Sequence, residues 1–478
     1  MDIIPSAVIM VISLTVMFLW FQGKRQPIHA AQEASDFPAV LLACWVVAAA
    51  IFGPNFFILR FAGVFDITIE RLLFILVIAY VTLGFFTGKI NILTHNSIEI
   101  AMFAFAVICL ISMMRVGFTS VDPARFPSPW FVFITGYLFP FVVYIYAKSF
   151  IQTEEQIHLI LTALFIFGIY LCLIAPLEYF QLRQYVYPQY INNPQISTLH
   201  LERARGPFLN AAFNGVAIVI GFISGMHLLP KKTGFSLAFN QMALLLFPPA
   251  VFFTLTRSVY LGFLISLFIF FMWYKTPFSK WKLVSIPVAV AVAAVFINAH
   301  RLASSDRREG GVYQVEEVQI RMALLGMSYY LFTQRPLLGI GLAQFIPVAT
   351  LSYTGKVPYV VEVSTPQFQH NHLMGIATEL GLVGLCTYLM MVVLILRRIL
   401  QTFKVLPEPG FMGKNLCVVV IAVWCVYLEN NLFVEPSNAL FINSVPFLFA
   451  GIADGLYVRV TEKSTVSDLS FRKLSQYV

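Results

Sequence analysis

Residues 369–395 read QHNHLMGIATELGLVGLCTYLMMVVLI, and this stretch sets the architecture of the chain. From Leu373 onward it is apolar over a length that can cross a lipid bilayer. A helix start needs only a cap, which Asn371 can provide, and it has no need of two histidines followed by Glu379 deeper in the run. Ionisable groups at such depth are costly and tend to mark function. The stretch therefore predicts a membrane helix that begins at a functional site.

The rest of the chain has the composition of an integral membrane protein. Of 478 residues, 59% are hydrophobic and 11% are charged, whereas soluble domains carry about 25% charged residues. No internal repeat or low-complexity tract is visible. The expected fold class is an all-α polytopic membrane protein with about 12–13 transmembrane helices. The candidate runs are 5–21, 38–59, 71–86, 98–114, 131–147, 158–175, 212–230, 237–255, 258–274, 283–299, 371–395, 416–433 and 439–457.

Processing signals and disulfides are not expected. The first run, from Pro5 to Phe21, has no basic residue ahead of it and no small-residue cleavage site behind it, so we interpret it as a retained helix. The cysteines all lie in apolar runs and form no CxxC pair, which predicts small apolar residues in the core or facing lipid. They are Cys44, Cys109, Cys172, Cys386, Cys417 and Cys425.

The basic residues predict the orientation of the helices. If successive runs cross alternately, nearly all lysines gather on one side, which the positive-inside rule makes cytoplasmic. The long polar segments 176–211 and 301–369 then lie outside, together with His370. The cytoplasmic set is Lys24, Arg25, Lys89, Lys148, Lys231, Lys232, Lys275, Lys280, Lys282, Arg397, Arg398, Lys404, Lys414 and the basic tail.

Arginine dominates the outer side, where Lys356 is the one lysine. A guanidinium can grip a phosphate with two parallel hydrogen bonds, so this face predicts an anionic ligand. Arginines that snorkel to lipid headgroups are the alternative. The net charge of +8 fits an anionic ligand and anionic lipid, and no nucleic-acid module is present. The outer arginines are Arg115, Arg125, Arg183, Arg203, Arg205, Arg257, Arg301, Arg307, Arg308, Arg321 and Arg335.

Three arginine-bearing segments are candidates for the anion site. In ERARGPFLN at 202–210, Gly-Pro breaks the chain and holds Arg203 and Arg205 beside a helix N-terminus, which itself favours anions. In LTRSVYLG at 255–262, Arg257 lies in a tight turn near the hydrocarbon boundary, where its charge needs a partner. Residues 313–332 can form an amphipathic helix on the membrane that turns Arg321 toward the site, with a structural role as the alternative.

A further segment carries the histidines. His370 and His372 are two residues apart and point to different faces if both are helical, so we do not expect them to serve one site equally. A boundary histidine that merely lies at the interface is the alternative.

Taken together, these segments resemble the O-antigen ligase/polymerase superfamily of bacterial membrane glycosyltransferases. The resemblance rests on RGPFLN at 205–210, TRS at 256–258 with LG at 261–262, RPLLGIG at 335–341, and HNxL at 370–373 running on to Glu379, Gly381 and Gly384. It covers roughly residues 200–400. It implies a GT-C-like bundle with a large periplasmic loop in the bacterial inner membrane, and a glycan taken from undecaprenyl pyrophosphate on the periplasmic face.

The resemblance also implies roles for individual residues. The arginines at 205 and 257 would hold the lipid pyrophosphate, and His370 would act on the acceptor hydroxyl. Arginine and histidine suit this chemistry, because guanidinium groups neutralise a leaving pyrophosphate and histidine accepts a proton near neutral pH. No DxD or HExxH motif is present, so we expect a reaction without metal or cofactor. A direct attack at the anomeric carbon needs no covalent nucleophile and would invert the configuration there. Further pyrophosphate ligands are Arg203 and Arg321, and supporting residues are Asn371, Glu379 and Glu429.

Four regions are expected along the chain. Residues 1–199 hold N-terminal transmembrane helices and the first long periplasmic loop, and 200–400 form the catalytic region with the loop 301–369. Residues 401–460 hold C-terminal transmembrane helices, and 461–478 form a cytoplasmic tail. Expected partners are an undecaprenyl-pyrophosphate-linked glycan, a glycan or lipid A-core acceptor, membrane lipids and other polysaccharide assembly proteins.

Several functions share these motifs. A polymerase of exopolysaccharide or O-antigen repeat units is favoured over a ligase to lipid A-core or a transferase to protein. The arginine-x10-glycine spacing associated with some polymerases is not met at Arg203, Arg205 or Arg321. A transporter or flippase for lipid-linked glycans is the alternative from another class, and it predicts repeated halves and helices broken at mid-membrane. A purely structural membrane subunit is a further alternative.

Overall fold

A computed structural model describes residues 35–59, 67–87, 96–120, 122, 126–231, 233–275, 315–352, 369–407, 410–436 and 439–474. Regular structure in these ranges is helical, apart from an isolated bridge between Leu59 and Ile67. Seven helical spans in the described ranges are long and apolar enough to cross a membrane. The expected all-α polytopic membrane fold is confirmed.

The seven spans are α4 (Ser97–Val116), α5 to α6 (Pro129–Phe150), α7 (Glu154–Tyr179), α8 with the turn after it (Ala211–Lys231), α9 to α10 (Gly234–Phe253), α17 (His372–Val405) and the first part of α19 (Leu440–Glu462). Two shorter apolar helices are α2 (Phe37–Ile51) and α11 (Arg257–Trp273). The helices α3 (Ile69–Phe86) and α18 (Lys414–Asn431) form at two further predicted positions. The predicted runs 5–21 and 283–299 lie outside the described residues.

Two of the predicted runs are shortened or divided in the structure. The run 38–59 ends as a helix at Ile51, because a Gly-Pro pair follows at 53–54. The run 237–255 is divided into α9 (Gly234–Leu244) and α10 (Phe247–Phe253), and Pro248 lies in the first turn of the second piece. Proline lacks a backbone N–H and clashes with the preceding turn, so it starts a helix more readily than it continues one.

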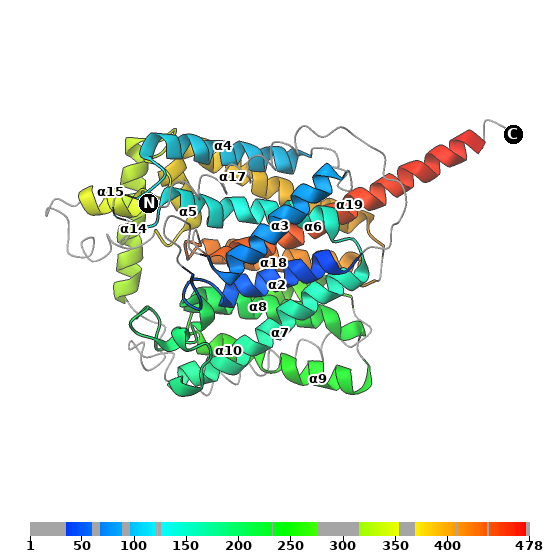
Figure 1. Cartoon of the computed structure of the whole chain (residues 1–478), viewed down its shortest axis with the longest axis horizontal. Helices are drawn as coiled ribbons and strands as arrows, with labels where there is room; N and C mark the ends of the chain where they lie inside the picture. Colours follow the sequence, from blue (N-terminus) through cyan, green and yellow to red (C-terminus); the bar gives the residue numbers. More distant parts are fainter. Residues whose placement is uncertain are drawn as a thin grey trace.

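Most long helices run side by side, whereas α14 (Val315–Gln334) lies across one end of the bundle (Figure 1). We call this the His370 end, because α17 begins there. The C-terminal part of α19 extends beyond the opposite end. The helix that the sequence predicts at 313–332 is therefore present as α14, and it lies over the His370 end.

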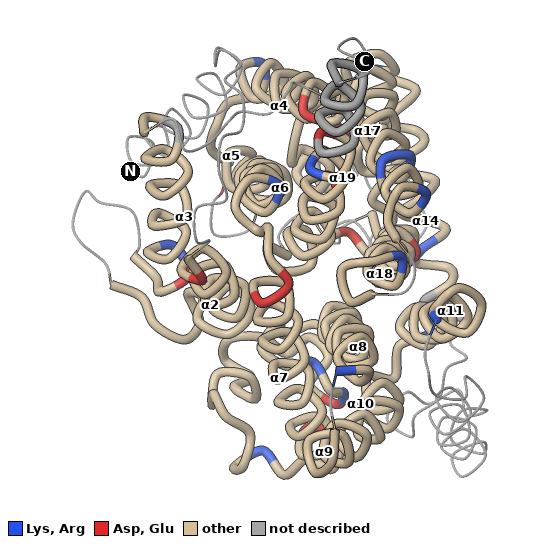
Figure 2. The backbone as a smooth tube through the Cα atoms, turned by 90° about the vertical axis from the view of Figure 1, so that its right-hand side faces the viewer, with Lys and Arg blue, Asp and Glu red and all other residues tan. Residues whose placement is uncertain are grey.

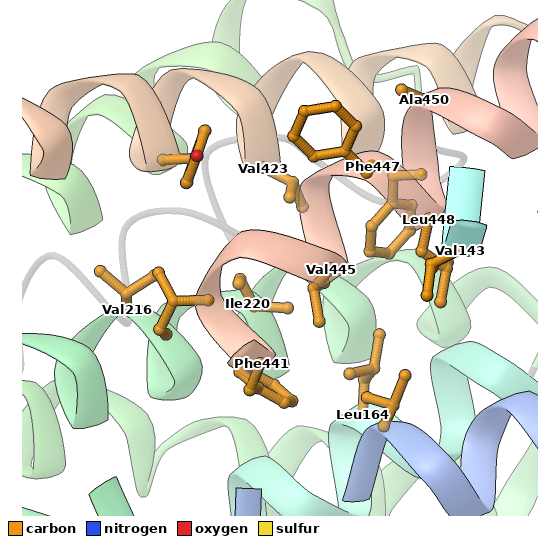
Figure 3. Packing of buried hydrophobic residues seen from close by; sticks show 14 of the residues in the cluster. Val143, Leu164, Val216, Ile220, Val423, Phe441, Val445, Phe447, Leu448 and Ala450 are labelled. Atoms are coloured by element: carbon orange, nitrogen blue, oxygen red, sulfur yellow. The ribbon is translucent and has the colours of Figure 1, made fainter. Parts of the chain in front are cut away.

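The centre of the bundle is formed around α19. Figure 3 shows its apolar side chains interleaved with those of four neighbouring helices, α6, α7, α8 and α18. The labelled residues are Val143, Leu164, Val216, Ile220, Val423, Phe441, Val445, Phe447, Leu448 and Ala450, all buried. In lipid the association of helices depends on close packing and polar contacts more than on the hydrophobic effect.

Both kinds of contact join α19 to α6 (Phe139–Phe150). A side chain at Gly451 or Gly455 would meet α6 backbone at 2.4 or 2.6 Å, so this small-xxx-small pattern allows a close approach. Beside it, buried Asp454 pairs with Lys148 at 2.9 Å and with Arg398 at 3.2 Å. Figure 2 looks along the helices from this end and shows charged positions on α4, α6 and α19 near one another. These ion pairs hold the opposite end of the bundle together.

Further lysines lie at this opposite end. Lys231 pairs with Glu154 at the start of α7, and Lys414 lies over the ring of Phe403 at 5.6 Å. These lysines therefore lie at the end of the bundle opposite His370, as the sequence predicts. The assignment of the lysine end to the cytoplasm stays a prediction.

Candidate active site

The helix α17 is broken at Gly381, where φ is 69° and ψ is −168°. The turn at 336–341 takes up the backbone groups that the break leaves without helical partners. Its amides donate to the carbonyls of Thr378 and Glu379, both at 2.9 Å, and its carbonyls accept from two amides after the break at 2.8 and 3.2 Å. Two of the motifs quoted above are thus one structural unit.

Only glycines fit where these two segments meet. A Cβ atom at Gly339 would lie 2.3 Å from the carbonyl of Glu379, and one at Gly381 would lie 2.3 Å from the carbonyl of Leu337. Both glycines also have positive φ, which side chains other than glycine rarely adopt. The ELG and LLGIG patterns are therefore explained by a backbone contact.

The Glu379 side chain strengthens the same contact. Its two carboxylate oxygens accept from the amides of Ala343 at 2.8 Å and Phe345 at 3.0 Å, at the start of α15 (Phe345–Ser352). From α4, Arg115 donates to the carbonyls of Leu338 and Gly339 at 2.9 and 3.1 Å. Glu379 in this geometry is a structural partner of the turn, which holds α14 and α15 over the start of α17.

The start of α17 is fixed by Asn371. Its side chain accepts from the amide of Met374 at 2.9 Å, which caps the helix, and donates to the carbonyl of Leu432 at 3.2 Å. The next residue, His372, is buried, and its Nδ1 lies 2.7 Å from Oε1 of Glu435. The ring of Tyr388 packs on it edge to face. Asn371 and His372 both tie α17 to the segment after α18.

His370 lies outside this network. It precedes the helix with φ of 54° and is half-buried. Burial and the positive charge of Arg321 lower its pKa to about 4, while Glu435 acts in the opposite direction. The imidazole is therefore neutral at neutral pH, and it faces a cationic neighbour.

Three of the predicted arginines lie together near this histidine. Burial lowers the pKa of Arg203; Tyr260 and Glu202 act in the opposite direction, and the charge of Arg321 lowers this pKa further. Burial likewise lowers the pKa of Arg321, and the charge of Arg257 lowers it further. Charges that shift one another's pKa in this way lie near one another in the structure. The arginines come from three segments far apart in sequence, and they make the His370 end strongly attractive to an anion.

The backbone explains how Arg203 reaches this cluster. The amide of Ala204 donates to the carbonyl of Phe253 at 3.0 Å, which docks the 202–205 segment on the turn between α10 and α11. Arg203 is buried there, which lowers its pKa to about 10. Arg257 is exposed and begins α11, so the N-terminus of that helix adds a partial positive charge.

Arg205 lies in a different environment. It is fully buried, and its guanidinium donates to the carbonyls of Ile191, Ser197 and Leu199, the last two at 2.9 and 2.7 Å. The adjacent amide of Gly206 donates to Glu178 at 3.1 Å. Four hydrogen bonds leave little of a guanidinium for a ligand. In this geometry Arg205 holds the loop before α8.

Glu429 lies at the end of α18 against α11. A Cβ atom at Gly262 would lie 3.1 Å from its Oε2, and its Oε1 has no hydrogen-bond partner among the described residues. The side chain is buried, on the neighbour of the helix that Arg257 begins.

Sequence reasoning missed Glu178 and Glu435. Glu178 ends the apolar run of α7, and Glu435 lies in the short link between two apolar runs at the His370 end. An acidic residue at the boundary of an apolar run is a signal for a buried partner, and it could have identified both. For metals, the described part of the chain contains no group of three or more His, Cys, Asp or Glu residues placed to hold an ion.

Part of the chain matches a known protein family. Residues 242–389 match the family model Wzy_C, described as O-Antigen ligase. The matched range contains Arg257, Arg321, His370 and the interlocked glycines, while Arg203 and Arg205 precede it. No curated protein matches the chain. The protein is a multi-pass membrane protein with an O-antigen ligase domain over these residues.

Proposed function

We propose that this protein is a glycosyltransferase that moves a glycan en bloc from undecaprenyl pyrophosphate to an acceptor hydroxyl. The observation that supports this most is the cluster of Arg203, Arg257 and Arg321 beside a neutral His370 at one end of the bundle. The match to the O-antigen ligase family adds lipid-linked glycans as the substrate class. We further propose that this end faces the periplasm in the bacterial inner membrane.

In the proposed reaction, the acceptor hydroxyl oxygen attacks the anomeric carbon and a new glycosidic bond forms. The bond from that carbon to pyrophosphate breaks, and the electron pair leaves with undecaprenyl pyrophosphate. Arg257, Arg321 and Arg203 stabilise the charge that develops on the leaving group, as preorganised donors do. The hydroxyl proton passes to His370. Direct attack inverts the configuration at the anomeric carbon.

The low pKa of His370 makes proton removal depend on the bound donor. An imidazole with a pKa of about 4 is a weak base, because burial and Arg321 disfavour its protonated form. A pyrophosphate bound at Arg321 offsets that positive charge and adds negative charge nearby. The pKa of His370 then rises toward the operating pH, where a general base works best. The histidine thus becomes an effective base when the donor is bound.

The other predicted residues have supporting roles in this proposal. Asn371 fixes the start of α17 and Glu379 fixes the turn above it. We assign Arg205 as a positioning residue, because its hydrogen bonds go to the loop before α8. Glu429, next to the helix of Arg257, is proposed to contact the acceptor.

We favour a polymerase of exopolysaccharide or O-antigen repeat units, with a ligase to lipid A-core or a transferase to protein as the alternative. The test is purified protein in lipid nanodiscs, supplied with lipid-linked repeat unit alone or together with lipid A-core. A polymerase gives a ladder of lipid-linked oligomers from the donor alone, whereas a ligase gives product only with lipid A-core. Absence of released undecaprenyl pyrophosphate with every acceptor would contradict glycosyl transfer.

A transporter of lipid-linked glycans remains the candidate from another class. It would use a break in a helix as part of a substrate path. The break in α17 at Gly381 is instead filled by the backbone of residues 336–341. In proteoliposomes, movement of the lipid-linked glycan between leaflets with no new glycosidic bond would favour the transporter.

A further inference from the structure

The helix α14 has two apolar faces. One face packs in a small core with α15, where Leu324 and Leu331 contact the region of Phe345 and Ile346. The other face is exposed: Val318 is 50%, Met322 65% and Tyr329 63% accessible. A helix on a protein surface normally directs its second face to water with polar side chains, so this second apolar face needs an explanation.

The exposed residues form a continuous line. Val318, Met322, half-buried Leu325 and Tyr329 follow one another at spacings of three or four residues, which places them on one side of the helix. We call them the α14 stripe. Over the helical rise of 1.5 Å per residue, the stripe extends for about 16 Å.

Arg321 borders this stripe. It lies three residues after Val318 and four before Leu325, so its side chain neighbours both on the helix surface. The same guanidinium belongs to the arginine cluster near His370 and Arg257. A cationic site for a phosphate and an apolar surface are therefore adjacent on one helix. This combination matches an amphiphile with an anionic head and a hydrocarbon chain.

We propose that the α14 stripe binds the first isoprene units of the donor's polyprenyl chain, next to the diphosphate at Arg321. The inference rests on the proposed function, because it takes the donor to be a polyprenyl diphosphate. The polyprenyl chain must leave the diphosphate along some apolar path, and the stripe runs past Arg321 on the same helix. The alternative occupants are ordinary membrane lipid and solvent.

Photo-crosslinking tests the site without needing catalysis. The probe is a polyprenyl diphosphate that lacks the glycan and carries a diazirine on its first isoprene units, and the labelled residues are mapped by mass spectrometry. We expect the probe to label residues 318–329. This labelling should fall at least about tenfold, equivalent to 1.4 kcal/mol, when inorganic pyrophosphate is added in excess and competes for the diphosphate site. Label on other helices only, or equal labelling of 318–329 by a diazirine phospholipid, would overturn the proposal.

Kinetics with two donors provide the second test. Both carry the same glycan and diphosphate, one on undecaprenol and one on a single isoprene unit. The double variant Met322→Gln with Tyr329→Ser should raise KM for the long donor about tenfold, leave kcat unchanged and leave the short donor unaffected. Tyr330→Ser is the matched control, because Tyr330 is 54% accessible but points about 100° away around the helix.

The outcomes separate the stripe from the proposed function. If the wild-type protein uses the long donor and the double variant keeps the wild-type ratio of the two donors, the stripe proposal is overturned and the proposed function stands. If the wild-type protein transfers neither glycan, the proposed function is lost, and the crosslinking result alone decides whether the stripe binds a polyprenyl diphosphate.

Discussion

Nδ1 of His372 lies 2.7 Å from Oε1 of Glu435, inside the bundle, whereas His370 lies just before the helix beside Arg321. The two histidines of the HNH pattern therefore have separate environments. One is held in a buried hydrogen bond that ties α17 to the segment after α18. The other borders the arginine cluster, where an anionic donor would bind.

Arg257→Lys should reduce transfer severely. Lysine keeps the charge but loses the planar fork that grips a phosphate. Hydrogen bonds to charged groups contribute about 1.5–3 kcal/mol each, so we expect a loss of about 10- to 100-fold in kcat/KM. The measurement is the rate of product formation from lipid-linked donor. Arg183→Lys is the control, because the side chain of half-buried Arg183 hydrogen-bonds only to Gln181 among the described residues. Equal rates in the Arg257 and Arg183 variants would mean that Arg257 is an anchor in the membrane boundary.

The pH dependence should differ between free and donor-bound protein. A base must be neutral to act, so activity falls as pH drops through its pKa. The acid limb of kcat/KM follows the free protein, where the pKa of His370 is about 4. The acid limb of kcat follows the donor complex, and we expect it at higher pH. Arg321→Gln should raise the acid limb of kcat/KM by removing a positive charge. Coincident limbs in wild-type protein, unchanged in Arg321→Gln, would contradict the proposed control of His370.

Gly381→Ala should disrupt the site without a change in charge. The added methyl group would lie 2.3 Å from the carbonyl of Leu337, at a φ of 69°. The clash and the backbone strain together destabilise the packing of the turn on α17 by about 1–3 kcal/mol. The turn at 336–341 should therefore separate from α17. Proteolysis near residue 338 reports this opening. Gly326→Ala is the control, since a Cβ atom there meets no atom within 4 Å and Ala favours a helix. Resistance of Gly381→Ala to protease, with full activity, would refute the interlock.

Arg205→Ala should affect the loop before α8 more than donor affinity. It removes hydrogen bonds to three carbonyls, of which that of buried Ile191 is left unsatisfied at a cost of about 1–3 kcal/mol. We expect a lower melting temperature and cleavage within 183–200. The donor Kd of the fraction that remains folded should change less than threefold. A large rise in that Kd with an unchanged melting temperature would instead make Arg205 a direct ligand of the pyrophosphate.

The sequence predicts the membrane fold and most helices well, because apolar length alone defines a membrane span. It also places Arg257, Arg321 and His370 at one end, since helix direction alternates along the chain. It does not predict the break at Gly381, because the run stays apolar through it and the compensating amides come from 336–341. The sequence also does not predict the hydrogen bonds of Arg205, because its partners are backbone carbonyls that no sequence pattern marks.

The central claim is that His370 removes the acceptor proton while the arginines bind the donor. The direct test measures transfer, donor binding and melting temperature for His370→Ala and His372→Ala. We predict that His370→Ala lowers kcat by about 10²- to 10⁴-fold, with donor Kd and melting temperature near wild type. His372→Ala should lower the melting temperature, because Glu435 loses a buried partner, while its folded fraction stays active. The opposite pattern, an active His370→Ala and a folded but inactive His372→Ala, would contradict the account.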